Sequence, residues 1–267
     1  MQALWNSLSA LHSSQDWLSR ISDNLANENT VGYASDQGSF TDAYTTAMQG
    51  NGPVNALAGR YTPPGWWGGT GIISTQNEKN FAGMPLQRTD NPLDFAIQGD
   101  GFFAVQSAGG NRLYTRAGNF TWSQQPDGSF ALATTTGEAV LDTNGQPIKS
   151  QNGVTAPLTV GSDGSVTIGG RATGQKLAIY RIPLAGQELQ SVGNNEFALA
   201  QGAQRVLLNQ GGTANNASIA QGMLNLSNVD TVKEMTDLIS AQRMFDLNTQ
   251  AIQLTNRMMQ DANTIRR

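Results

Sequence analysis

The sequence predicts an α+β fold, in which long N- and C-terminal α-helices pair as a coiled-coil-like stem and carry an inserted, mainly antiparallel β domain. Three observations favour it. Apolar residues recur at helical spacing near the N-terminus, they recur every seven residues near the C-terminus, and short β-like runs separated by turn dipeptides lie between. A chain of 267 residues is also long enough to bury a core without a metal or a disulfide.

The N-terminal helix is predicted from an apolar stripe. Its members are spaced by three, four or seven residues, which places them on one face of a helix. Asparagines and Gly32 follow the stripe and end the helix before Gly32. The stripe consists of Leu4, Leu8, Leu11, Leu18, Ile21 and Leu25.

The C-terminal helix is predicted from a heptad repeat and from the absence of Pro and Gly in residues 229–267. Asp230 or Thr231 can cap its first turn. The repeat consists of Leu238, Phe245, Ile252 and Met259.

Polar residues weaken this C-terminal seam. Gln242, Thr249 and Asn256 stand where a strong zipper carries leucine, so the seam is expected to need several neighbouring helices. The same residues are candidates for fixing the register between packed helices, because a buried amide must find a partner. The simpler alternative is a terminal helix that docks on its own domain.

Antiparallel β structure is predicted between the helices, because turn dipeptides such as Asp100-Gly101 and Asn144-Gly145 separate short apolar runs. The candidate strands are 93–97, 102–106, 112–115, 119–122, 130–133, 166–168 and 176–181.

Two segments lack either periodicity. Residues 50–71 are rich in Gly and Pro and contain Trp66 and Trp67, and residues 202–222 are expected to be a loose connector to the last helix. Consecutive tryptophans do not both bury easily in one small core, so this pair is a candidate partner interface. The predicted division is 1–30 for the N-terminal helix, 31–84 for a connector, 85–222 for the β domain and 223–267 for the C-terminal helix.

Composition excludes several classes of partner. Charged residues make up 13% of the chain, and its net charge of -4 provides no basic surface for nucleic acid. Cysteine is absent, and no apolar run is long enough to insert in a membrane. The first twenty residues lack the apolar core of a signal peptide, so an exported chain is expected to use another route.

Catalytic chemistry is not expected. The single histidine, His12, has no His, Cys or acidic residue at metal-binding helical spacing except Asp16. Asp90, Asp94 and Asp100 lie close together in sequence, but they stand in turn-forming contexts in which carboxylates accept hydrogen bonds from nearby backbone groups. We therefore predict no catalytic, metal or cofactor site and no enzyme activity.

Several motifs resemble those of flagellar rod, hook and hook-associated proteins. The first is Asn24-Leu25-Ala26-Asn27 followed by Thr30-Val31-Gly32-Tyr33. The second lies in the middle of the chain and resembles the core-domain motif of this family. It begins with Asn91-Pro92-Leu93-Asp94-Phe95, continues to Gly101-Phe102-Phe103, and is followed by Tyr114-Thr115-Arg116-Ala117-Gly118-Asn119-Phe120. The C-terminal signature resembles Ser227-Asn228-Val229 and the helix after it.

This resemblance is strongest to the distal rod type, while Glu234-Met235-Thr236-Asp237-Leu238-Ile239 also resembles the proximal rod proteins. In either case it implies a structural subunit of the flagellar basal body. It implies helical assembly through the terminal helices with copies of itself and with other rod and hook proteins. It also implies an extracytoplasmic location reached through the flagellar type III exporter, without a cleaved signal peptide. The alternatives are a secreted β-rich adhesin or carbohydrate-binding module that uses Trp66 and Trp67, or a polysaccharide-acting enzyme that uses the aspartates.

Overall fold

The computed structural model describes residues 2–38, 40–42, 72–74, 78–107, 109–125, 128–150, 157–208 and 217–265. Within these ranges, side chains are not described for residues 2–5, 40–42, 72–74, 262, 263 and 265. The chain divides into two compact units, one made of residues 1–26, 36–78 and 230–267 and the other of residues 27–35 and 79–229.

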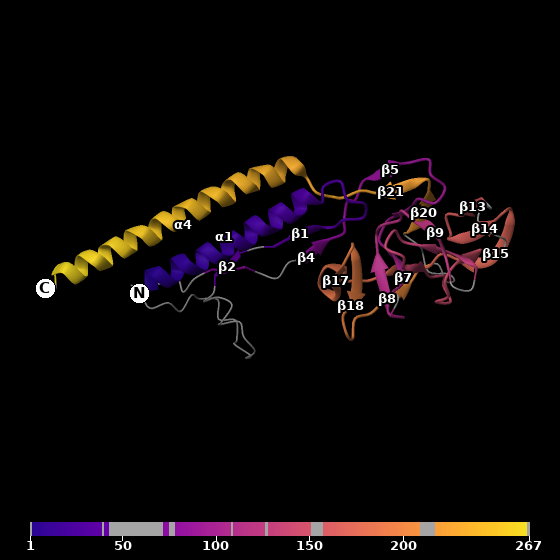
Figure 1. The fold of residues 1–267 in the computed structure, drawn as a ribbon, viewed down its shortest axis with the longest axis horizontal. Coiled ribbons are helices and arrows are strands. Elements are labelled where there is room, and N and C mark those ends of the chain that lie inside the picture. Colours follow the sequence, from indigo (N-terminus) through magenta and orange to yellow (C-terminus); the bar gives the residue numbers. More distant parts are fainter. Residues whose placement is uncertain are drawn as a thin grey trace, which may run out of the picture. The chain divides into compact units, whose positions relative to one another are not determined.

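The first unit holds the two long helices, α1 (Gln2–Ala26) and α4 (Thr231–Ile265), which lie side by side (Figure 1). The short strands β2 (Phe40–Asp42) and β3 (Ile72–Ser74) form an antiparallel pair in the same unit. Helix α4 begins where Asp230 Oδ1 accepts hydrogen bonds from the backbone N–H groups of Val232 at 3.1 Å and Lys233 at 3.2 Å. This is the N-terminal cap expected from the sequence.

The second unit is built on antiparallel strands. Its largest sheet among the described residues has ten strands, with β12-β10-β11-β7-β8-β18-β17 in order, β9 beside β10, β16 beside β7 and β19 beside β16. Their bounds are β7 Phe102–Gln106, β8 Arg112–Thr115, β9 Thr121–Gln124, β10 Phe130–Ala133, β11 Ala139–Val140, β12 Lys149–Ser150, β16 Ile179–Arg181, β17 Leu189–Gly193, β18 Glu196–Leu199 and β19 Val206–Leu207.

Smaller pairings and one short helix complete the described elements. A three-stranded sheet contains β13, β14 and β15, while β20 pairs with β6, β21 with β5 and β1 with β4. Their bounds are β1 Ser35–Gln37, β4 Glu78–Asn80, β5 Leu86–Arg88, β6 Phe95–Gln98, β13 Leu158–Val160, β14 Ser165–Ile168, β15 Arg171–Lys176, β20 Ser218–Gln221, β21 Met223–Asn225 and α3 Ala185–Glu188.

The core of the second unit lies on both faces of β7, because successive side chains of a strand point to opposite sides. Phe103 and Val105 enter one buried apolar cluster, and Phe102 and Ala104 enter the other. Phe103 packs edge-to-face on Phe120, with ring centroids 5.3 Å apart. A strand buried on both faces reads as a continuous apolar run, as residues 102–105 of β7 do.

The predicted fold class is confirmed as α+β with terminal helices and a mainly antiparallel β domain. The bounds predicted for β7, β8 and β10 match the structure, and four other predicted strands are displaced by a few residues. The connector expected over 202–222 is wrong in part, because β20 lies within it and pairs with β6. Ile219, which faces Ile97 across that pair, is 4% exposed and holds the segment in the core.

Candidate assembly interface

Polar side chains join α1 to α4 at two levels. Asn24 Nδ2 donates a hydrogen bond to Glu234 Oε1 at 3.0 Å, and Asn248 Nδ2 donates one to Ser14 Oγ at 3.3 Å. The end of α1 therefore lies beside the start of α4, and the two helices run antiparallel.

The Asn24 side chain forms hydrogen bonds through both its oxygen and its nitrogen. It is 2% exposed, and its Oδ1 accepts a hydrogen bond from the backbone N–H of Asp36 at 2.8 Å. Its Nδ2 also donates to the backbone carbonyl of Asp36 at 3.1 Å. Burial raises the pKa of Glu234, and the hydrogen bond from Asn24 partly opposes that rise. Asn24 thus fixes the chain after α1 and the first turn of α4 together.

The face of α4 toward α1 alternates steps of three and four residues. Ala241, which is 0% exposed, lies at its centre, where the absence of a long side chain lets the helices approach closely. Most of the other members are half-buried and several are polar. The face consists of Glu234, Leu238, Ala241, Phe245, Asn248, Ile252 and Thr255.

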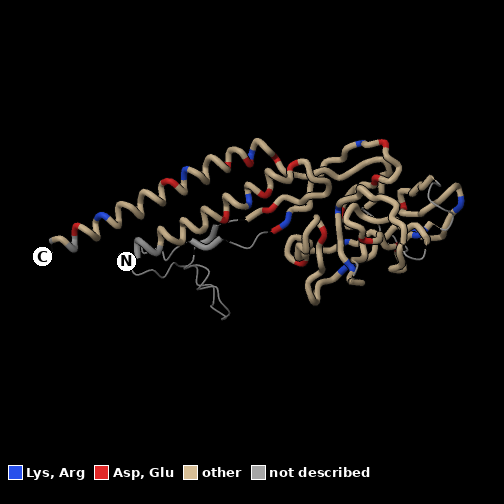
Figure 2. The backbone as a smooth tube through the Cα atoms, in the orientation of Figure 1, with Lys and Arg blue, Asp and Glu red and all other residues tan. Residues whose placement is uncertain are grey.

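A second apolar stripe runs along the C-terminal half of α4 and is exposed. It has the same alternating three- and four-residue steps, so it forms one continuous face of the helix. Leu247 is 63% exposed and Leu254 is 58% exposed. Charged residues are sparse along α1 and α4 (Figure 2). We call this face the outer stripe, and it consists of Met244, Leu247, Ala251, Leu254 and Met258.

Some predicted residues of the C-terminal seam lie on the face of α4 toward α1, and others are exposed. Leu238, Phe245 and Ile252 are half-buried on the face toward α1. Gln242 and Asn256 are exposed, because Ala241, Asn248 and Thr255 take the alternate positions of that face. Met259 continues the spacing of the face but is 41% exposed. Thr249 is half-buried and donates to the carbonyl of Phe245 at 2.9 Å within its own helix. A role for these residues between chains stays a prediction.

On α1, the predicted stripe is only partly enclosed. Ile21 is 2% exposed, Leu11, Leu18 and Leu25 are half-buried, and Leu8 is 36% exposed. The side chain of Leu4 lies outside the described residues. Trp66 and Trp67 also lie outside the described residues, so their predicted interface role stays a prediction.

Several polar residues of the helix pair were not singled out in the sequence. Ser13, Ser14 and Arg20 are at most 5% exposed on α1. A Cβ added at Gly38 would collide with the Arg20 guanidinium, so the chain after α1 passes close over this side chain. The missed signal is that Ser14 lies three residues after Leu11 and four before Leu18, so it continues the helical spacing of the apolar stripe.

The sequence motifs that surround α1 and α4 meet in the second unit. Gly32 N–H donates to the carbonyl of Asn225 at 2.8 Å, and a Cβ added at Gly32 would lie 2.7 Å from Cα of Ala117. Asn225 in turn bonds the backbone N–H of Ile97 at 2.8 Å through Oδ1 and the Ile97 carbonyl at 3.1 Å through Nδ2. We call this group of contacts the motif junction.

Two other asparagines of the sequence motifs, Asn27 and Asn228, also form hydrogen bonds through their side chains. Asn27 Oδ1 accepts a hydrogen bond from Thr30 Oγ1 at 3.1 Å and so closes the turn that follows α1. Asn228 accepts from the backbone N–H of Ser35 at 2.9 Å and donates to the carbonyls of Asn80 and Ala82 at 2.9 Å and 2.8 Å. The motif residues around the junction therefore hold backbone segments that are distant in sequence.

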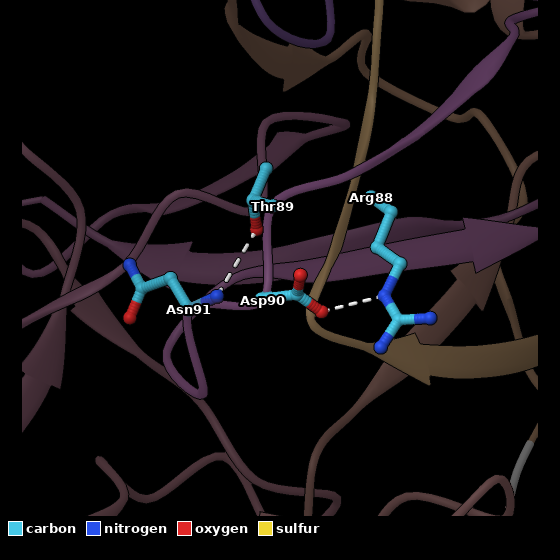
Figure 3. A network of polar contacts seen from close by, with 4 residues as sticks. All are labelled: Arg88, Thr89, Asp90 and Asn91. Atoms are coloured by element: carbon cyan, nitrogen blue, oxygen red, sulfur yellow. Dashed lines mark hydrogen bonds and ion pairs between the residues drawn. The ribbon is translucent and has the colours of Figure 1, made fainter.

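Two of the aspartates considered for catalysis, Asp90 and Asp94, accept hydrogen bonds from neighbouring side chains, where the sequence predicted backbone donors. Asp90 Oδ1 accepts from Nε of Arg88 at 2.5 Å, and the Thr89 hydroxyl accepts from the backbone N–H of Asn91 at 3.4 Å (Figure 3). Asp94 Oδ1 accepts from Asn91 Nδ2 at 3.0 Å.

Among the described residues, no three His, Cys, Asp or Glu side chains gather in a group that would hold a metal ion. No described helix combines the length and apolar character that a membrane span requires.

Comparisons with known proteins agree with the motif pattern. Residues 220–265 match the family model for the C-terminal region of flagellar basal body rod FlgEFG proteins, and residues 96–168 match the flagellar hook protein FlgE/F/G D1 domain. The chain is 30% identical to the flagellar basal-body rod protein FlgG of Buchnera aphidicola from Schizaphis graminum, over 97% of each chain. It is also 30% identical to FlgG and to the hook-basal body complex protein FlhP of Bacillus subtilis, over 100% of each chain.

Proposed function

This chain belongs to the family of flagellar basal-body rod proteins and is a structural subunit of the flagellar rod, and we propose that it polymerises helically through its terminal helices. In this proposal the helical polymer transmits torque from the motor to the hook. The partners are copies of the same chain and other rod and hook proteins. The chain catalyses no reaction.

The outer stripe is the observation that supports polymerisation. One face of α4 is used against α1, while the outer stripe leaves Leu247 and Leu254 largely exposed. Contiguous exposed apolar faces mark interaction sites, and covering one leucine contributes about 1.5–3 kcal/mol. A helix with two apolar faces can bind its own partner and a neighbouring helix at the same time.

A contact of this kind favours a filament over a closed dimer. If the outer stripe of one copy binds a different surface of the next copy, the contact is heterologous and can repeat without closing. The exposed Leu8 on α1 belongs to such a complementary surface in this proposal. Export through the type III apparatus delivers the subunit to its extracytoplasmic place in the basal body in this proposal.

The test compares polymerisation of the purified chain with that of the double variant Leu247→Gln/Leu254→Gln. Glutamine keeps a high helix propensity, so α4 is expected to form while the stripe loses its apolar surface. We expect sedimentation and electron microscopy to show polymers of the parent chain and none of the variant at the same concentration.

Leu184→Gln is the matched control, because Leu184 is 57% exposed but lies in the second unit, just before α3. This single change is expected to leave polymerisation intact. Polymers of the Leu247→Gln/Leu254→Gln variant that resemble those of the parent chain would contradict the role of the outer stripe.

A further inference from the structure

A cavity of about 500 Å³ opens beside β8 in the second unit. The end of β7 and the start of β8 supply Ser107, Asn111, Arg112 and Tyr114, and the region after β18 supplies Arg205. The exposed Val192 of β17 lies at its rim. All of its lining belongs to residues 107–205, which lie within the second unit.

The lining of this cavity carries positive charge without a carboxylate. Arg112 and Arg205 are both present, and neither Asp nor Glu is among the residues that line the cavity in the described part of the chain. The ion pairs found between described residues lie elsewhere, at Arg88–Asp90 and Lys176–Asp163. A pair of unneutralised guanidinium groups is unusual in a chain whose net charge is -4.

Two buried tyrosines hold the guanidinium groups in place. Arg112 Nη1 donates to the Tyr180 hydroxyl at 3.3 Å, and Arg205 Nη1 donates to the Tyr114 hydroxyl at 2.9 Å. Both guanidinium carbons also lie near the Tyr180 ring, at 5.6 Å and 5.9 Å from its centroid. Tyr114 and Tyr180 are 0% and 6% exposed, so the core fixes these anchors.

The polar groups at this position are mostly donors. Each guanidinium has five N–H groups and uses one of them on a tyrosine hydroxyl, so most of its donors remain available to a ligand. Burial raises the pKa of Tyr114, although the nearby Arg205 and Arg112 oppose the rise, and its hydroxyl therefore keeps its proton at neutral pH. A protonated hydroxyl that accepts from arginine can still donate to another group.

From this arrangement we propose that the cavity binds an oxyanion, namely a carboxylate or a phosphate group. The guanidinium fork matches the geometry of both, and stacking on Tyr180 holds it in position before the ligand arrives. Binding neutralises Arg112 and Arg205, which lack a carboxylate in the cavity lining. The site is independent of polymerisation through the terminal helices, because no lining residue belongs to them.

The first test is a titration with inorganic phosphate at constant ionic strength, followed through the arginine Nε–H signals in ¹⁵N NMR spectra of the full chain. Sodium chloride replaces phosphate in the reference titration, which removes the general effect of screening. We expect saturable shifts of the Arg112 and Arg205 signals in the parent chain. In Arg205→Gln we expect the Kd for phosphate to be at least tenfold higher. Arg205 is exposed, so this change is expected to leave the sheet folded.

Arg171→Gln is the matched control, since Arg171 is an exposed arginine on β15 outside the cavity. It is expected to leave the phosphate Kd unchanged. Shifts that rise linearly without saturation, or that weaken equally in Arg171→Gln and Arg205→Gln, would overturn the proposal and leave Arg112 and Arg205 as packing for Tyr180.

A pentaglutamate peptide distinguishes the two sources of the oxyanion. A Kd at least tenfold lower for this peptide than for phosphate supports a carboxylate presented by a polypeptide. Saturable binding of phosphate alone supports a free ion. Absence of saturable binding by both probes overturns the site.

Discussion

Gly32 is held in a left-handed backbone conformation at the motif junction, with a φ of 70°. This region costs a residue with a side chain about 1–2 kcal/mol, and a Cβ at Gly32 would also press on the Ala117 backbone. We expect Gly32→Ala to lower the free energy of unfolding of the second unit by more than about 2 kcal/mol. Urea unfolding followed through the amide NMR signals of β7 and β8 measures this change.

Gly83 separates the two causes of that loss. Its φ is 71°, but no atom lies within 4 Å of an added Cβ. Gly83→Ala is therefore expected to cost only the conformational part, about 1–2 kcal/mol. Equal losses in the two variants would mean that the close approach of Gly32 to Ala117 does not contribute to stability.

Glu196 makes the stability of the β domain depend on pH. Burial, together with the neighbouring Glu138 carboxyl, raises the pKa of Glu196 from 4.5 to about 7. Thr136 Oγ1 lies 3.2 Å from Glu196 Oε1, and Thr134 Oγ1 donates to Glu138 Oε2 at 2.6 Å. Burial acts to raise the pKa of Glu138, but hydrogen bonds from the Thr134 and Thr136 hydroxyls to this carboxyl lower it overall. The folded chain thus favours the protonated form of Glu196.

The sign of the effect follows from that raised pKa. The stabilisation from proton binding at Glu196 is fully present below pH 4.5 and is lost as the pH rises through about 7. Across this interval the slope from Glu196 approaches about -1.4 kcal/mol per pH unit in the free energy of unfolding. We expect Glu196→Gln to remove this slope in urea unfolding series, and an unaltered slope would count against a proton held on Glu196.

At the scale of elements, the sequence predicts structure wherever one strong period or one buried run governs a segment. The apolar face from Leu8 to Leu25 and the run Phe102–Gln106 meet this condition, and both elements form. The strand β20 was missed because small and polar residues flank Ile219, and its burial depends on pairing with β6 from a distant part of the chain. Non-local pairing of this kind leaves no local period.

The candidate interface was predicted less completely than the helices that carry it. The heptad repeat of Leu238, Phe245 and Ile252 identifies one face of α4, but it does not say which alternate position completes that face. Close approach to α1 selects the small Ala241 over Gln242. The choice depends on the partner helix, so it cannot be read from the period of α4 alone.

At the scale of the whole molecule, the two units differ in how their backbone is protected. Ala241 is the only residue below 9% exposed among the α4 side chains that the structure describes, whereas four of the five residues of β7 are buried. Isolated helices gain most of their stability from tertiary packing, and α4 has packing on one narrow face. Stability is therefore expected to be concentrated in the β domain.

Amide hydrogen exchange on the dilute monomer tests this distribution. We expect residues 2–26 and 231–265 to exchange at least about tenfold faster than β7, β8 and β10, because opening the helix pair exposes little buried apolar surface. In assembled polymers, covering the outer stripe is expected to slow exchange over 244–258 while leaving β7 unchanged. Exchange over 244–258 that is equally slow in monomer and polymer would mean that α4 is already stable alone, so assembly through its outer stripe would not be coupled to helix ordering.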